Sequence, residues 1–172
     1  VLLIFAYPPY DLEFLTWIAL IPFLYFLSLK SVSTKKAFIG GTICGILFFG
    51  KLLSWLFATA PFEWLGIAIK GNIVSVFILL IVLYIIQTVF LGLFIGLFAY
   101  CLKRILKCSA IRPKHFLIIP SLWIVLEYLR AWGFGILYLG KESFLGPHWT
   151  FGNLAYTLHN NLTLIQIADI GG

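Results

Sequence analysis

Long apolar runs separated by short polar turns dominate this chain. Four of these runs are predicted to cross a membrane as helices, at about residues 14–29, 37–60, 73–102 and 116–132. Two shorter apolar stretches, 1–6 and 162–172, are expected to be parts of further spans. The pattern therefore predicts one all-α domain over residues 1–172, a polytopic membrane helix bundle with four to five transmembrane helices and both ends truncated.

The breaks between the runs contain residues that end helices. Pro8 and Pro9 lie in the turn 7–13, and Pro61 follows the run 37–60. Proline ends a helix because it lacks the backbone N–H and its ring clashes with the preceding turn. The last break, 133–161, is long and rich in glycine, aromatic residues and asparagine, so we expect it to be a loop.

Charged residues divide the breaks into two kinds. Loops 30–36 and 103–115 together contain eight of the twelve Lys and Arg residues. Five of the six acidic residues fall in or next to the segments on the other side, which include breaks 7–13, 61–72 and 133–161. By the positive-inside rule, loops 30–36 and 103–115 are expected to be cytoplasmic.

Composition favours a membrane protein over a soluble domain. Hydrophobic residues make up 62% of the chain and charged residues 10%, against about 45–50% and about 25% in soluble domains. The net charge of +6 is explained by attraction of the two basic loops to anionic lipid, so no nucleic-acid partner is expected. The cysteines form no CxxC pair and the histidines lie apart, so we predict no metal site and no cofactor.

The span 116–132 contains a charged pair. Trp123, Glu127 and Arg130 follow one another at steps of four and three, which places them on one stripe of a helix. An ionisable residue at the centre of a membrane helix costs about 2.5–3.5 kcal/mol, so these two need compensation. Two interpretations stay open: a structural pair that locks the helix against its neighbours, or a polar patch that faces a lipid headgroup or a catalytic domain.

The span 37–60 contributes one further charge and a packing motif. Lys51 either extends toward the membrane surface along Trp55 or is a buried charge partner of Glu127. The spacing Gly41-xxx-Gly45, repeated at residues 92 and 96 in the next run, predicts close helix packing.

No catalytic residue is predicted in this chain. A nucleophilic cysteine needs its base within hydrogen-bond reach. Cys101 and Cys108 are expected on the cytoplasmic side, whereas Glu127 is expected near the other side, across roughly 30 Å of hydrocarbon. Cys44 is expected in the cytoplasmic half of its span, so no complete triad can form from these residues.

Four segments together resemble a known family. Residues 5–24 contain an apolar run, a Pro-Pro-aromatic turn and a helix with an internal Pro, and residues 37–56 form a Gly- and Phe-rich span that ends in Trp. Residues 120–132 contain the pattern Pro-x-x-Trp-x-x-x-Glu-x-x-Arg, and residues 164–172 contain Gln-x-Ala…Gly. In this order the segments resemble the N-terminal membrane part of bacterial apolipoprotein N-acyltransferase.

The resemblance implies a function for the longer protein. Members of the family pass an acyl chain from a phospholipid, through a cysteine nucleophile, to the N-terminal cysteine of a lipoprotein. A Glu-Lys-Cys triad does this in a nitrilase-like periplasmic domain that follows the membrane part, and no residue here matches the triad. The chain is thus expected to be the scaffold in the bacterial inner membrane, with loops 7–13, 61–72 and 133–161 periplasmic. Its implied partners are a phospholipid acyl donor, a lipoprotein acceptor and the nitrilase-like domain.

Departures from the family pattern keep two alternatives open. The loop after Arg130 lacks a Gly-Phe-Pro-Trp-like run, Ala155 replaces the glycine expected before Tyr156, and Lys51 is unusual at its position. These differences allow a non-catalytic membrane assembly protein. A transporter or channel subunit could instead use Lys51 and Glu127 as a polar relay, although no span shows a clear break at its middle.

Overall fold

Every regular element in the described part of the chain is a helix. The computed structural model describes residues 2–59, 73–108, 113, 115–137 and 150–166. Its elements are η1 (Leu2–Ala6), α1 (Leu15–Ile18), α2 (Ile21–Ser28), α3 (Thr34–Leu52), η2 (Leu53–Thr59), α4 (Ile73–Cys108), α5 (His115–Leu137), η5 (Leu154–Leu158) and α6 (Leu162–Ile165). These ranges contain no strand, which confirms the predicted all-α membrane helix bundle.

Within the described ranges, three helices are long and apolar enough to cross a membrane: 34–59, 74–106 and 115–137. The run 14–29 forms two short helices, α1 and α2, where one span was expected. Pro22 lies in the first turn of α2, where its missing N–H removes no intrahelical bond. Of the partial spans, 1–6 contributes the 3₁₀-helix η1 and 162–172 begins with α6, while residues 167–172 lie outside the described ranges.

Several helices extend past one end of the apolar runs that predicted them. α3 begins at Thr34 because the Ser33 hydroxyl accepts a hydrogen bond from the Lys36 amide at 3.2 Å, which caps the first turn. α4 continues through the basic residues to Cys108, since Lys and Arg favour helix as strongly as Leu does. α5 ends at Leu137, so the expected loop 133–161 begins with helix.

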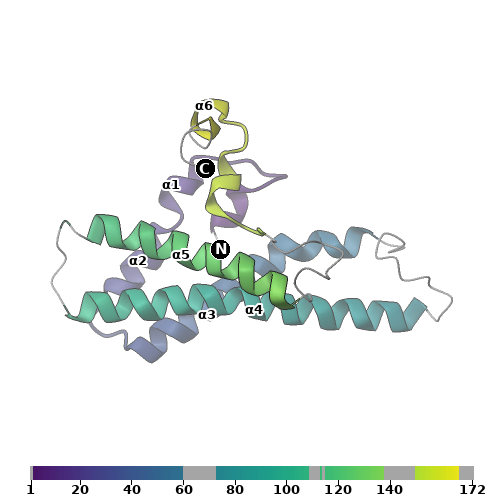
Figure 1. The fold of residues 1–172 in the computed structure, drawn as a ribbon, viewed down its shortest axis with the longest axis horizontal. Helices are drawn as coiled ribbons and strands as arrows, with labels where there is room; N and C mark the ends of the chain where they lie inside the picture. The colour runs from purple at the N-terminus through teal and green to yellow at the C-terminus, as the bar shows by residue number, and fades with distance from the viewer. Residues whose placement is uncertain (1, 60–72, 109–112, 114, 138–149, 167–172) are drawn as a thin grey trace.

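The three long helices lie along the long axis of the molecule, as Figure 1 shows. The first N-terminal elements, η1 and α1, in purple, and the segment 150–166, in yellow, gather on one side of α5. Hydrogen bonds between residues 7 and 153 and between residues 16 and 157 join these two segments. The N-terminal segment and the segment after α5 therefore form one layer over the long helices.

Glycines allow α3 and α4 to pack at short distance. A Cβ atom on Gly45 would lie 2.8 Å from the Cα and the carbonyl oxygen of Gly92, and one on Gly41 would lie 2.7 Å from the Cβ of Ala99. Real Cβ atoms do not approach backbone this closely, so only glycine permits the contact. The packing predicted from the two glycine motifs is confirmed.

Two clusters of buried apolar side chains hold the bundle together. One lies around η1 and the ends of α3 and α5, and includes Phe49, Leu53 and Phe134. The other lies around α2, the start of α3 and the later part of α4, and includes Leu27, Phe98 and Leu102. Each cluster has polar groups beside it, and these two places are the candidate sites described below.

Candidate functional site

Helix α5 carries the charged pair predicted from the sequence. Glu127 and Arg130 are one turn apart, and Glu127 Oε1 lies 3.9 Å from Arg130 Nη2. The Arg130 side chain is only 3% exposed and that of Glu127 16%. A separation of 3.9 Å is long for an ion pair, so other groups must also stabilise the buried guanidinium.

The segment after α5 supplies those groups. Arg130 Nη2 donates a hydrogen bond to Asn153 Oδ1 at 2.7 Å, and the amide of Leu154 donates to Glu127 Oε1 at 3.0 Å. The hydroxyl of Tyr7 donates to the carbonyl oxygen of Asn153 at 2.9 Å. We call these four side chains and the Leu154 amide the polar clasp, because they join the first turn, α5 and the returning segment.

The aromatic ring of Phe49 covers Arg130 on another side. Its guanidinium carbon lies 5.0 Å from the ring centre of Phe49 on α3, within the range of a cation–π interaction. Gly152 lies against the same ring with a φ of +62°, and a Cβ there would come within 2.9 Å of Phe49 and Leu52. Residue 152 must therefore be glycine, both for its left-handed backbone and for the close approach.

Tyr7 is suited to its role as a donor in the clasp. Its side chain lies outside the membrane-spanning helices and the residue is 5% exposed. Burial raises the pKa of the Tyr7 phenol, and the negative charge of Glu127 raises it further. The phenol consequently stays protonated and continues to donate to Asn153 at every physiological pH.

A second polar contact ties the returning segment to the N-terminal elements. Thr16 Oγ1 and Thr157 Oγ1 are hydrogen-bonded at 2.7 Å, and Thr157 Oγ1 donates to the Leu154 carbonyl at 2.7 Å. Both threonines are buried. This contact lies four residues beyond Asn153, so η5 is held at both ends.

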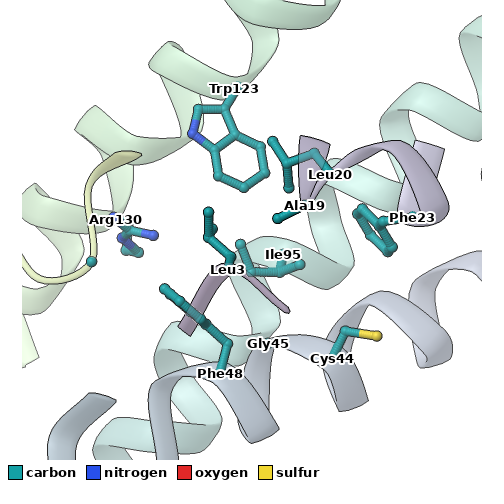
Figure 2. Close-up of a pocket in the computed structure, with 11 residues that line it drawn as sticks. Leu3, Ala19, Leu20, Phe23, Cys44, Gly45, Phe48, Ile95, Trp123 and Arg130 are labelled. Carbon is teal, nitrogen blue, oxygen red and sulfur yellow. The ribbon is translucent and has the colours of Figure 1, made fainter. Parts of the chain in front are cut away.

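Trp123 lies beside an apolar cavity within the bundle. The cavity measures about 70 Å³ and is also lined by Leu3, Phe23 and Phe48. Figure 2 shows the Trp123 ring above it, with Arg130 on one side and Phe23 and Cys44 on the other. The volume is less than half of the roughly 150 Å³ that admits benzene, so the cavity is too small in this structure for an acyl chain.

The structure also places the remaining candidate residues. Lys51 is exposed on α3, and Glu127 contacts Arg130 and Leu154. The buried pairing of Lys51 with Glu127 is thus not formed, and the polar relay of a transporter loses its basis. Across the described part of the chain, no group of three or more His, Cys, Asp or Glu side chains is placed to hold a metal ion.

Comparison with known proteins identifies the family. The model of the apolipoprotein N-acyltransferase N-terminal domain matches residues 1–172, which is the whole chain. The chain belongs to this family. Three of its described helices are long and apolar enough to cross a membrane, so within this family it is a multi-pass membrane protein.

Two curated relatives agree with this assignment. The chain is 29% identical to an apolipoprotein N-acyltransferase from Gloeobacter violaceus over 97% of its length. It is 30% identical to an apolipoprotein N-acyltransferase from Geobacter metallireducens over 100% of its length. In both cases it spans 28% of the relative. No solved structure gives a significant match.

Within this N-terminal domain, the sequence by itself predicted one half of the clasp. Glu127 and Arg130 were visible because they share a helix face. Tyr7 and Asn153 were not, since each contacts a residue far away in the chain and neither is charged. The available signals were the glycine beside Asn153 and the position of Tyr7 directly before the two prolines.

Proposed function

We propose that this chain is the membrane scaffold of an apolipoprotein N-acyltransferase of the bacterial inner membrane. The full-length protein would transfer an acyl chain from a phospholipid to the N-terminal cysteine of lipoproteins. Family membership supports the reaction class. The polar clasp is the structural observation that supports the scaffold role.

The clasp would give a second, catalytic domain a rigid support. Arg130 lies 15 residues after His115, about 22 Å along α5 from the basic loop. Under the positive-inside orientation this is the periplasmic part of the bundle, where the reaction of the family takes place. Sites of chemistry need rigid support, and here buried hydrogen bonds hold the segment 150–158 to two other parts of the chain.

The decisive experiment uses the protein expressed from its complete gene. The purified protein would be mixed with phospholipid and a synthetic peptide that carries an N-terminal diacylglyceryl-cysteine. We expect the peptide mass to increase by one acyl chain, and no increase when phospholipid is omitted. A folded, monodisperse protein that leaves the peptide unchanged would contradict the proposal and favour the non-catalytic assembly protein.

The scaffold role has its own test within the same assay. Asn153→Ala removes the Arg130 acceptor without touching any group of the triad, and Asn160→Ala serves as the exposed control. We expect lower acyl transfer per folded molecule for Asn153→Ala and an unchanged rate for Asn160→Ala. Equal rates for both variants and the wild type would show that the clasp supports folding alone.

A further inference from the structure

A second polar site lies at the opposite, basic end of the bundle. The end of α2, the start of α3 and the last turns of α4 border an open cavity of about 720 Å³. Three lysines and four hydroxyl side chains line it: Lys30, Lys35, Lys103, Ser28, Ser31, Ser33 and Thr34. This volume is about ten times that of the apolar cavity beside Trp123.

Lys103 is the buried member of this group. It is 6% exposed, and its Nζ donates hydrogen bonds to the carbonyl oxygens of Leu27 at 2.9 Å and Leu29 at 2.7 Å. These bonds cap the C-terminal end of α2. An ammonium group has three donors, so the two carbonyls leave one N–H, and neither carbonyl carries a full negative charge.

Among the described residues, no carboxylate is paired with these lysines. The sequence has no Asp or Glu from residue 14 to residue 62, nor from residue 64 to residue 126. The ion pairs found among the described residues are Arg130–Glu127 and His159–Asp11, and both lie at the other end of the bundle. A buried cation without a counterion is unfavourable, so an external anion would complete the site.

The start of α3 adds to the positive potential. Ser33 caps this helix, and Lys35 lies in its first turn. The positive end of the helix dipole therefore points toward the same cavity as the lysines. Lys30 and Lys35 are exposed, and their flexible side chains can reach an anion held above Lys103.

The position of the cavity indicates where the anion comes from. The apolar part of α4 ends at Leu102, directly before Lys103 and Arg104. The adjoining faces of α2 and α3 expose large apolar side chains, among them Tyr25, Ile39 and Ile43. The cavity thus lies at the level where lipid headgroups meet their chains.

We propose that this cavity binds the phosphate group of an anionic phospholipid, with the lipid chains along the exposed faces of α2 and α3. Lys30, Lys35 and Lys103 neutralise the phosphate, and the hydroxyls of Ser31 and Thr34 donate hydrogen bonds to it. This site is separate from the polar clasp and does not depend on the proposed acyl transfer.

The test compares two variants of the full-length protein with the same loss of charge. Lys30→Gln/Lys35→Gln removes two lysines from the cavity wall. Lys36→Gln/Arg104→Gln removes two exposed cations that lie beside the cavity and do not line it. Binding of phosphatidylglycerol, with phosphatidylcholine of the same chains for comparison, would be measured by native mass spectrometry on delipidated protein.

We expect the wild type to retain phosphatidylglycerol in preference to phosphatidylcholine. Because a charge-assisted hydrogen bond contributes on the order of tenfold in affinity, the cavity variant should bind at least about tenfold more weakly than the control variant. Phosphatidylglycerol should also raise the melting temperature of the wild type and the control variant, and leave that of the cavity variant unchanged.

Three results would overturn the proposal. An equal loss of phosphatidylglycerol affinity in the two variants would mean diffuse attraction between a basic surface and anionic lipid. Equal retention of the two lipids by the wild type would mean no phosphate-specific site. Displacement of the lipid by glycerol 3-phosphate at equal concentration would assign the cavity to a soluble anion.

Discussion

At the scale of single residues, the central question is how Arg130 is stabilised inside a membrane bundle. Glu127 contributes charge at 3.9 Å, Asn153 contributes a hydrogen bond at 2.7 Å, and Phe49 covers the guanidinium. The guanidinium donates a hydrogen bond through Nη2 while its carbon lies over the Phe49 ring, an arrangement that the compact ammonium of lysine cannot reproduce. The position therefore requires arginine for its shape as well as its charge.

Arg130→Met should destabilise the protein strongly. Loss of the guanidinium leaves the carboxylate of Glu127 and the amide oxygen of Asn153 without their partner. We expect the free energy of unfolding to fall by about 3 kcal/mol. Arg130→Lys should recover less than half of this loss. Denaturant unfolding in mixed micelles measures both variants, and Arg104→Met, at an exposed position, should cost less than about 1 kcal/mol.

Tyr7→Phe should have a smaller effect that depends on pH. Below pH 10 the variant loses one hydrogen bond, a cost of about 1 kcal/mol. The pKa of folded Tyr7 is raised above the ordinary value of 10.0, so the unfolded phenol ionises first and the wild type loses stability as the pH rises above that value. The stability difference between wild type and variant, measured from about pH 8 to about pH 11, should be constant and then shrink. A difference that grows above pH 10 would contradict the burial of a protonated phenol.

At the scale of elements, polar groups and glycines decide how the helices meet. The glycine pairs bring the backbones of α3 and α4 together, and the Tyr84 hydroxyl on α4 also donates a hydrogen bond to the Gly50 carbonyl oxygen on α3. Lys103 fixes α2 by donating to the carbonyls at its C-terminal end. This contact matters because a helix of eight residues contributes little stability of its own. Close glycine contacts are thus confined to the two long helices, whereas side-chain hydrogen bonds to backbone carbonyls join α4 to both α2 and α3.

Gly45→Ala should loosen the contact between α3 and α4. The new Cβ would lie 2.8 Å from the Gly92 backbone, which cannot move aside without shifting the helix. We expect a loss of about 1–3 kcal/mol in the free energy of unfolding. Gly40→Ala is the matched control, because its Cβ would meet only the Phe26 ring at 3.2 Å, and that side chain can turn away. Equal losses in both variants would point to glycine backbone effects instead of packing.

At the scale of the whole molecule, the two polar sites lie at different depths along the bundle. The clasp lies near the later part of α5, and the basic cavity lies at the end of α4. Under the positive-inside rule the first is periplasmic and the second cytoplasmic. The orientation predicted from the charges is therefore the assumption that links both sites to their proposed roles.

Cysteine labelling in intact cells tests this orientation. With Cys44, Cys101 and Cys108 replaced by serine, Ser31→Cys and Asn160→Cys would each place one thiol at an exposed position. We expect a membrane-impermeant maleimide to label the thiol at position 160 from the periplasm, and the thiol at position 31 only after the inner membrane is opened. The reverse pattern would contradict the assignment of both sites.

The sequence alone determined the features that depend on neighbours along the chain. Apolar run length predicted the helical bundle, glycine spacing predicted the α3–α4 contact, and the three-residue step brought Glu127 beside Arg130. These follow from helix geometry, which repeats every 3.6 residues and can be read without knowing the fold. Pro22 could have indicated the break between α1 and α2, where the apolar run 14–29 predicted a single span.

Only the tertiary structure decided which groups meet across distance. Tyr7 contacts Asn153 although 146 positions separate them, and Lys103 caps a helix 76 positions earlier. No periodicity encodes such pairs, because their partners are set by how the helices pack and by where buried polar groups must find hydrogen bonds. Arg130 shows both sources at once: its helix face was determined locally, and its burial between Phe49 and Asn153 was determined by the folded chain.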